Sequence, residues 1–599
     1  MEDISSTRTD SLTKISNILY KHKNTCNTYV FVVGGHALVI DPGNGQVFEQ
    51  LHHIGVTRLD TVIVTSHKRA MSAGVHIASM LYPQATVLVP KDEMQIFTQN
   101  SEYWQNKTVF TFLKLDSSFD APIHGAVCEG IDDGDVFSWQ GIDFKIIKTP
   151  GVTTGAITVA CELNGKRIAF CGGLCCDGGK VWSLYDFQWY YLPGPLFEEW
   201  EQSLDTLHGY GPDILYPGFG DSPAVPESIP MLKQRVLDLK ALMFPPRLSS
   251  TREPGKQLLP HLYFVADTTF LLVSDEGKGL VVDYGLVNDE YLQPFVDKGI
   301  VKTIDRIIIT HCHYDHYARA AELKYKSFND TTPTTETEIW TINEMADVFE
   351  NALAYYDVPC LIAGGMEIDR VFASGESVCW EGYKLTFYHH PGQTWYALGL
   401  LAEIDGHKVL FTGDNNWPIE GGRTVTPVIF KNILPDSYVP LAEEVRALSP
   451  DFIAASHYGM FEVDSFMLDS YVQWAKDLEG AFADISVHEA HRYSTDCAFA
   501  RFHPYYQKVG AGEDFTVRLS VKNHYDKDVE IAAVIDVQEF VEPPTAGTQK
   551  AYVPAGDNAE FDFQLHLKPG AGKRAVIAAE ITIDGNNFGQ ACECMVEIV

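Results

Sequence analysis

A short stretch of the chain gathers side chains of the kind that bind metal ions in enzymes. It reads Thr-His-Cys-His-Tyr-Asp-His and supplies four ligand-type residues: His311, His313, Asp315 and His316. Neutral imidazole nitrogens and carboxylate oxygens suit zinc, iron or manganese. Three histidines and an aspartate in so short a run favour a metal site over an ordinary polar loop, and such a site would activate water.

The residues around this cluster predict a loop between a strand and a helix. Residues 304–310 form a short apolar, β-branched run that is typical of a buried strand, and residues 314–325 have the composition of a helix. Ligand sites of layered proteins lie preferentially in such loops. We therefore expect the sheet to deliver the cluster to its carboxyl edge.

The cluster resembles the metal-binding signature of the metallo-β-lactamase superfamily of metallohydrolases, and further landmarks of that family follow. Asp283-Tyr284-Gly285 resembles the Asp-x-Gly turn whose aspartate orients the metal loop. Asp414 ends a segment that resembles the strand end whose aspartate bridges two metals, and His457 lies in a segment that resembles the last ligand loop. The resemblance implies an α/β (α+β) fold of the αββα sandwich type, zinc as the cofactor and six metal ligands: His311, His313, Asp315, His316, Asp414 and His457.

One landmark departs from the family pattern. His389-His390-Pro391-Gly392-Gln393-Thr394 resembles a Pro-Gly-His-Thr segment, but Gln393 stands where the family has a histidine ligand. A glutamine oxygen is a much weaker zinc ligand than imidazole, so the first ion could bind loosely, accept Gln393 at long range or recruit His390. A single ion could still be held by the remaining set: Asp315, His316, Asp414 and His457. Whether one or two ions bind stays open.

The first half of the chain repeats the landmarks of the second half without its ligands. Collinear matches pair Asp41 with Asp283, an offset of 242 residues, and Thr65 with Thr310, an offset of 245. This pattern indicates a tandem duplication. In the first copy the ligand positions carry other residues: Ser66, Lys68, Ala70, Met71, Val152, Gly173 and Gly218. We expect a degenerate, metal-free copy, because Lys68 and Arg69 in that pocket would repel a divalent cation.

Length and composition bound the architecture. A chain of 599 residues with 45% hydrophobic residues should form several domains, since single cores rarely exceed roughly 250–300 residues. Residues 244–255 are rich in proline, serine and charge and predict a linker. Alternating stretches near the carboxyl end predict an immunoglobulin-like β-sandwich. The predicted domains are 1–248, the degenerate copy; 249–499, the metal-binding copy; and 500–599, the β-sandwich.

Charge and apolar patterning bear on partners and location. The chain has 45 Lys and Arg against 80 Asp and Glu, and its net charge of −35 disfavours nucleic acid as a partner. Neither a run of about 18 apolar residues nor a signal peptide occurs, so we expect a soluble, cytoplasmic protein without membrane contact. The 12 cysteines are scattered, as in proteins with reduced thiols. The sandwich could pack on the enzyme, bind a partner or mediate a homo-oligomer.

Together, these expectations predict that the protein is a metal-dependent hydrolase. Its substrate would be a small ester, lactone, thioester or phosphodiester. Asp315 would be the catalytic residue that orients water and relays its proton, and Tyr458 or His390 would help to stabilise the developing oxyanion. One alternative is a nuclease, because the long tRNA 3′-processing endonucleases also pair a degenerate copy with an active one. The other is a non-catalytic scaffold or binding protein that keeps a residual metal site.

Overall fold

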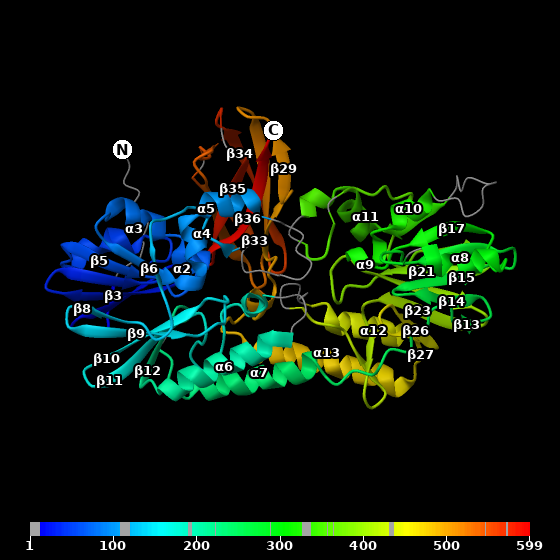
Figure 1. Cartoon of the computed structure of the whole chain (residues 1–599), viewed down its shortest axis with the longest axis horizontal. Coiled ribbons are helices and arrows are strands. Elements are labelled where there is room, and N and C mark those ends of the chain that lie inside the picture. Colours follow the sequence, from blue (N-terminus) through cyan, green and yellow to red (C-terminus); the bar gives the residue numbers. More distant parts are fainter. Residues whose placement is uncertain are drawn as a thin grey trace. The chain divides into compact units, whose positions relative to one another are not determined.

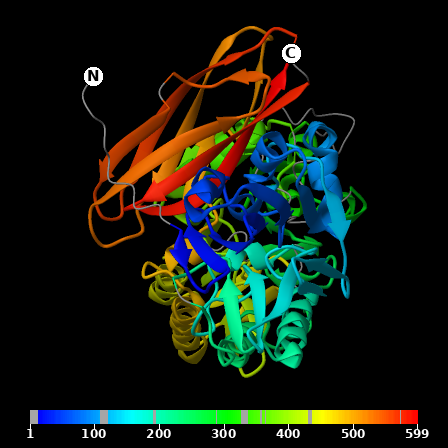
Figure 2. The ribbon, with the colours of Figure 1, turned by 90° about the vertical axis from the view of Figure 1, so that its left-hand side faces the viewer.

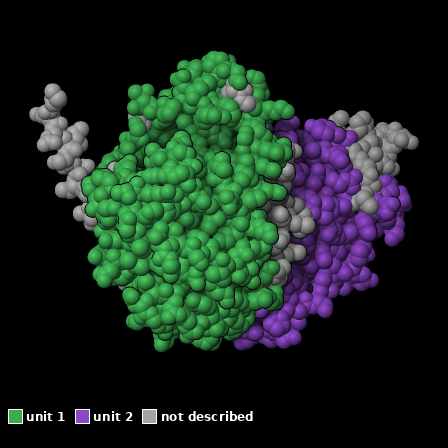
Figure 3. Space-filling model, turned by 60° about the vertical axis from the view of Figure 1, so that its left-hand side comes forward, with its two compact units in different colours: residues 1–108, 113–237, 483–599 green, residues 109–112, 238–482 purple. Residues whose placement is uncertain are grey.

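The computed structural model describes most of the chain. The described residues are 12–107, 120–189, 194–221, 223–287, 289–325, 337–355, 358–362, 364–429, 436–545, 547–570 and 573–599. The chain packs as two compact units (Figure 3). The first unit combines residues 1–108, 113–237 and 483–599, and the second combines residues 109–112 and 238–482. The division into three domains stays a prediction.

The histidine cluster lies in the second unit, whose first sheet has seven strands in sequence order. They are β13 (Gln257–Leu259), β14 (Leu262–Ala266), β15 (Thr269–Val273), β16 (Lys278–Val282), β17 (Thr303–Ile308), β18 (Glu338–Ile342) and β19 (Arg370–Phe372). Strands β13 to β16 pair antiparallel, and β16 to β19 pair parallel. The run expected as a buried strand is β17, labelled in Figure 1. It pairs in parallel with β16, so the carboxyl ends of the two strands lie side by side.

The second sheet of this unit has the order β20-β21-β22-β23-β26-β27. Its strands are β20 (Ser377–Trp380), β21 (Tyr383–His389), β22 (Leu398–Ile404), β23 (His407–Gly413), β26 (Phe452–Ala455) and β27 (Gly459–Glu462). Strands β23 and β26 run parallel, and β24 (Trp417–Ile419) and β25 (Arg423–Val425) form a hairpin. Buried side chains of both sheets share one core, among them Leu271, Ile307, Phe387 and Phe411. The two mixed sheets therefore pack face to face.

Helices complete the second unit, and one of them differs from the expectation. They are α8 (Asp289–Asp297), α9 (Tyr314–Tyr317), α10 (Ala320–Lys324), α11 (Asn343–Glu350), α12 (Tyr438–Leu448) and most of α13 (Ser465–Ile485). The helix expected over 314–325 breaks into α9 and α10. The Arg319 N–H donates to the Tyr284 carbonyl, 3.1 Å away, and the Asp315 carbonyl accepts from the Thr268 hydroxyl at 3.0 Å. These tertiary bonds replace the hydrogen bond that would continue the helix.

The first half of the chain, in the other unit, repeats the strand order of the first sheet, and its second sheet repeats the order β20-β21-β22-β23-β26 without a counterpart of β27 among the described residues. One sheet runs β1 (Thr13–Lys14), β2 (Leu19–Lys23), β3 (Asn27–Val33), β4 (His36–Ile40), β5 (Arg58–Ile63), β6 (Thr86–Pro90) and β7 (Glu129–Ile131). The other contains β8 (Val136–Trp139), β9 (Ile142–Lys148), β10 (Ile157–Leu163), β11 (Lys166–Gly172) and β12 (Ile214–Pro217). The parallel pairs also correspond, with β4 beside β5 and β11 beside β12.

Helices of the first half pack against its first sheet. The helices of this half are α1 (Val47–Gln50), α2 (Arg69–Ser72), α3 (Val75–Leu81), α4 (Met94–Thr98), α5 (Asn100–Asn106), α6 (Gly194–Tyr210) and α7 (Ser228–Met243), whose last turns belong to the second unit. Phe48, Val75 and Phe97 bury against Val39 and Val62. The opposite face of that sheet shares a core with the second sheet, so the layers again run helix, sheet, sheet.

The carboxyl end of the first unit is built from two stacked sheets, drawn orange to red in Figure 2. Their strands are β28 (Ala500–His503), β29 (Tyr506–Val509), β30 (Asp514–Lys522), β31 (Val529–Val537), β32 (Val541–Glu542), β33 (Thr548–Val553), β34 (Asn558–Leu567), β35 (Arg574–Ile583) and β36 (Asn586–Ile598). The sheet orders are β28-β30-β34-β32 and β29-β36-β35-β31-β33. Residues of β30 and β34 alternate between buried and exposed, as in a sheet with one solvated face. Across the described residues, the helices all fall short of the length and apolarity that crossing a bilayer requires.

Candidate metal centre

A turn at the end of β16 fixes the metal loop. Asp283 is fully buried and accepts three hydrogen bonds of 2.7 Å, from the Thr310 N–H, the Thr310 hydroxyl and Nδ1 of His316. A Cβ atom on Gly285 would lie 1.9 Å from the carbonyl oxygen of Asp315, so only glycine allows the loop to pack here. The Asp-x-Gly turn therefore sets the position of the loop and turns Nε2 of His316 toward the cluster.

All six expected ligands meet at the carboxyl ends of β17, β23 and β26, in two adjoining groups. The first group contains His311, His313 and Asp414, and the second contains Asp315, His316 and His457; within each, the ligand atoms lie within 4.8 Å of one another. Asp414 connects the groups. Its carboxylate lies 3.8 Å from His311 Nε2, 3.3 Å from His316 Nε2 and 3.2 Å from His457 Nε2. Asp414 would therefore contact a cation held in either group.

Burial and charge divide the histidines of the centre into two kinds. Burial lowers the pKa of His313 to about 4 and that of His311 well below its usual value, which keeps both imidazoles neutral and able to bind a cation. Burial acts the same way on His457, but the carboxylates of Asp414 and Asp315 outweigh it and raise its pKa to about 9. The second group therefore favours positive charge, which a proton or a metal ion can supply.

The residues present fit a divalent cation. Nε2 of His311, Nε2 of His316 and Oδ1 of Asp414 are buried polar atoms without a hydrogen-bond partner in the part of the chain that is described. Buried polar atoms normally have partners, so a set of ligand atoms that converge without them is typical of a metal site. Imidazole nitrogens together with carboxylate oxygens match zinc and also iron or manganese.

The tentative residues lie at different places around this centre. Gln393 points its amide at the first group, where Nε2 donates to Oδ2 of Asp414 at 3.0 Å. His390 is fully buried, and its Nδ1 lies 3.2 Å from a carboxylate oxygen of Glu444 on α12. The Tyr458 ring packs on Trp417 at 5.3 Å between centroids. The expected His390 and Gln393 roles as substitute ligands stay predictions, as does an oxyanion role for Tyr458.

Two residues that support the centre were not found from the sequence. The hydroxyl of Thr310 lies 3.1 Å from Nδ1 of His311 while it donates to Asp283. The amide of Asn415 accepts from the Gln393 N–H at 2.9 Å and donates to the His390 carbonyl at 3.0 Å. Thr310 could have been inferred, because Thr65 repeats it in the first half. Asn415 directly follows Asp414, but nothing in the sequence indicates that its side chain ties two ligand loops together.

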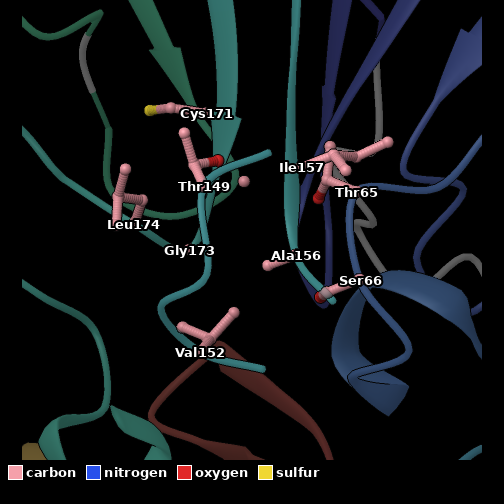
Figure 4. Close-up of a pocket in the computed structure, with 10 residues that line it drawn as sticks. Thr65, Ser66, Thr149, Val152, Ala156, Ile157, Cys171, Gly173 and Leu174 are labelled. Atoms are coloured by element: carbon pink, nitrogen blue, oxygen red, sulfur yellow. The ribbon is translucent and has the colours of Figure 1, made fainter. Parts of the chain in front are cut away.

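In the first half, a methionine occupies the space that corresponds to the centre. Met71 Sδ accepts from the Ser66 hydroxyl at 3.4 Å and the Thr65 hydroxyl at 3.5 Å. A Cβ atom on Gly218 would lie 2.7 Å from the Met71 methyl group, so the absence of a side chain there makes room for the thioether. The pocket beside it has no imidazole or carboxylate among its lining residues (Figure 4), which are Thr65, Ser66, Thr149, Val152, Ala156, Ile157, Cys171, Gly172, Gly173 and Leu174.

The two cations of that loop do not line this pocket, contrary to the expectation that they would face it. Lys68 forms ion pairs with Asp120 and Asp186, and Arg69 forms one with Glu593 on β36, 2.5 Å away. The guanidinium of Arg69 is 1% exposed and also donates to the Gln590 carbonyl. Long, fully charged side chains avoid an apolar pocket and instead reach carboxylates at its rim. The loop that would carry ligands thus contacts the carboxyl-terminal sheets of its own unit.

Comparisons with known proteins agree with this geometry. The family model described as "Metallo-beta-lactamase superfamily" matches residues 264–457. A hydroxyacylglutathione hydrolase of Aeromonas salmonicida is 26% identical over 156 residues, 26% of this chain and 48% of that protein. An RNase J-like protein of Methanocaldococcus jannaschii is 30% identical over 149 residues, 25% of this chain and 33% of that protein.

The chain therefore spans less than half the length of these relatives. A solved structure, a metallo-beta-lactamase family protein from Thermus thermophilus, is 17% identical and covers 36% of this chain and 77% of that chain, with a TM-score of 0.28. The family match spans both sheets of the second unit and the loops that hold the six converging side chains. Through residues 264–457, the chain matches the metallo-beta-lactamase superfamily.

Proposed function

We propose that this protein is a zinc-dependent hydrolase of a small ester, lactone, thioester or phosphodiester. The observation that carries the proposal is the convergence of four imidazoles and two carboxylates at the carboxyl ends of strands from both sheets, within the segment that matches the family model. The relative named hydroxyacylglutathione hydrolase supports a hydrolytic reaction. Zinc is favoured because imidazoles dominate the donor set.

When bound, a divalent cation supplies Lewis acidity, which makes water a stronger acid and polarises the bond to be cleaved. The chain's own residues then handle the proton. Asp315 is the more exposed of the two carboxylates, with 16% of its side chain accessible against 6% for Asp414. It is therefore the carboxylate that accepts the proton of the attacking water and returns it to the leaving group. His311 and His313 stay neutral and act as ligands.

We further propose that the first half is a degenerate copy of the second, and that its role is to hold the carboxyl-terminal β-sandwich, which we take to be immunoglobulin-like. The common strand order and the repeated Asp41 and Asp283 positions support the duplication. The buried Arg69 and Glu593 pair supports the holding role. A copy without metal does not need an open pocket for substrate. Its loop can therefore form buried contacts with the β-sandwich, which would close the pocket of a catalytic loop.

A nuclease is the second candidate function, since the RNase J-like relative is 30% identical over its matched segment. The net charge of −35 argues against it, because a polyanionic substrate would be repelled unless basic residues lined its path. Cleavage of a labelled single-stranded RNA by the zinc-loaded protein would favour this function, and turnover of small esters without RNA cleavage would favour the first.

Metal analysis and a substrate screen test the proposal together. The purified protein should retain at least one zinc ion per chain after desalting, and His313→Ala or Asp315→Ala should lower that content. An Asp315→Ala variant should also lose turnover of p-nitrophenyl esters, thioesters, lactones or bis-p-nitrophenyl phosphate. His52→Ala removes an exposed histidine from the other unit and serves as the control. Protein that binds metal but turns over none of these substrates would instead support a non-catalytic scaffold or binding protein with a residual metal site, and protein without bound metal would contradict the proposal.

A further inference from the structure

The segment that precedes the second unit's sheets is fixed beside the metal centre, although its composition predicts a linker. The Leu248 N–H donates to the Pro418 carbonyl at 3.2 Å, and the Glu420 N–H donates to the Pro246 carbonyl at 3.3 Å. The segment thus extends the β24–β25 hairpin by an antiparallel bridge between Arg247 and Ile419. Backbone hydrogen bonds on both sides hold the Arg247 side chain in one direction.

Arg247 lies over an aromatic ring next to the ligands. Its guanidinium is 4.0 Å from the centroid of the Trp417 ring, and it forms a hydrogen bond with the Tyr458 side chain. The Trp417 ring in turn lies 6.5 Å from the ring of His457, a residue of the second group. One aromatic ring therefore lies between this guanidinium and the metal centre.

The guanidinium of Arg247 has no acidic partner within the described residues. Other arginines of the same unit pair with carboxylates, such as Arg306 with Glu338, Arg319 with Glu322, and Arg446 with Glu443. A guanidinium offers five N–H donors, and a tyrosine hydroxyl can occupy few of them. In a chain of net charge −35, a cation left without a carboxylate at the edge of a metal centre is available to a ligand.

We propose that Arg247 is a specificity-determining residue that binds a carboxylate or phosphate group of the substrate, at the end remote from the bond that is cleaved. Trp417 keeps the guanidinium plane fixed, so the fork can receive two oxygens of one oxyanion. The substrate of the proposed hydrolase is then a small anion rather than a neutral ester. This inference rests on the proposed function, but the binding step does not need catalysis.

A matched pair of substrates tests the inference. The zinc-loaded protein is assayed with mono-p-nitrophenyl glutarate, which carries a free carboxylate, and with neutral p-nitrophenyl butyrate. Arg247→Ala should lower kcat/KM for the glutarate ester about 10- to 100-fold, mainly through KM, because a hydrogen-bonded charge is lost. The butyrate rate and the zinc content should stay the same. Arg247→Lys should recover part of the loss, and Arg446→Ala, which removes a paired arginine, should change neither substrate.

Binding measurements separate failure of this inference from failure of the proposed function. Glutarate and inorganic phosphate are titrated into metal-depleted wild-type and Arg247→Ala protein by calorimetry. Binding to the wild type alone supports the subsite even if no ester is hydrolysed, and the stronger of the two ligands identifies the oxyanion. If the loaded enzyme hydrolyses both esters and Arg247→Ala slows them equally, or if neither anion binds the wild type, the subsite is overturned.

Discussion

Replacement of Asp283 by asparagine tests whether this buried carboxylate controls metal binding through His316. The wild-type carboxylate lies 2.7 Å from Nδ1 of His316 and holds a proton there, so Nε2 is the ring atom left to bind a metal ion, and it is directed at Asp414, 3.3 Å away. An asparagine amide can still accept from Thr310 but presents its NH₂ group to the ring. The imidazole then accepts at Nδ1 and keeps its proton on Nε2, the atom that must bind the metal.

The magnitude follows from the role of such supporting residues. Loss of a partner that orients a ligand lowers metal affinity about 10- to 100-fold, or roughly 1.4–2.8 kcal/mol. The hydrogen bond from the Thr310 N–H goes to the other carboxylate oxygen, Oδ1, and survives, so the fold should persist, and the expected loss is mainly one of affinity. Competition with a chromophoric zinc chelator near neutral pH measures the affinity, and thermal unfolding of the metal-free protein measures stability.

The first half supplies a matched control. Asp41 accepts from the Thr65 N–H at 2.7 Å and from the Thr65 hydroxyl, as Asp283 does from Thr310, but Met71 replaces the histidine. Asp41→Asn should therefore leave zinc affinity unchanged. Equal affinities of wild type and Asp283→Asn, or an equal loss in both variants, would refute the reasoning that the carboxylate acts through the tautomer of His316.

Three further outcomes are expected. Gln393→His should raise the zinc content toward two ions per chain by mass spectrometry, since imidazole replaces an amide at the first group; a content that stays at one would show that Gln393 does not limit the site. Burial raises the pKa of the Asp41 carboxyl to about 7, against about 3.9 in the unfolded chain. The folded protein therefore binds this proton more tightly than the unfolded chain does, and the resulting stabilisation is fully present below about pH 4. It falls by up to roughly 4 kcal/mol as the pH rises to 7. Asp41→Asn should flatten this decline in denaturant titrations, and an unchanged slope would contradict it. Arg69→Met should destabilise the first unit by about 3–5 kcal/mol because the Glu593 carboxylate stays buried without the guanidinium. Adding Glu593→Gln to this variant should recover part of the lost free energy of unfolding. If the effects of the two substitutions simply add, the two residues do not act as a pair.

The strands and the histidine cluster could be predicted because both leave a local signature, and the structure brings the six candidate ligands together. Residues 304–310 are apolar and β-branched, and the strand β17 forms where that run stands. The alternate spacing of His311, His313 and Asp315 is typical of an extended segment that leads into a helix. Asp414 and His457 were found by resemblance alone, and they join the cluster because their strands β23 and β26 are parallel neighbours.

What could not be predicted depends on contacts between distant residues. Composition assigned residues 244–255 to a linker, whereas edge pairing with Ile419 holds Arg247 beside Trp417. The helix expected over 314–325 breaks because the Arg319 N–H donates a hydrogen bond to the Tyr284 carbonyl instead of to the carbonyl one helical turn before it. No local propensity encodes either contact, since both depend on where a separate segment lies.

The first half has a loop of the same build without the ligand residues. Thr65 donates to Asp41 as Thr310 does to Asp283, so the two loops are fixed in the same way although their side chains differ. At the position of His316 a methionine fills the space, and beside it Arg69 reaches Glu593 on β36. A buried ion pair contributes little net stability but strongly penalises any alternative partner for either charge. The loop therefore suits a docking role, in which one defined arrangement matters more than affinity, and this gives a physical reason for the first half to keep the loop without the ligands.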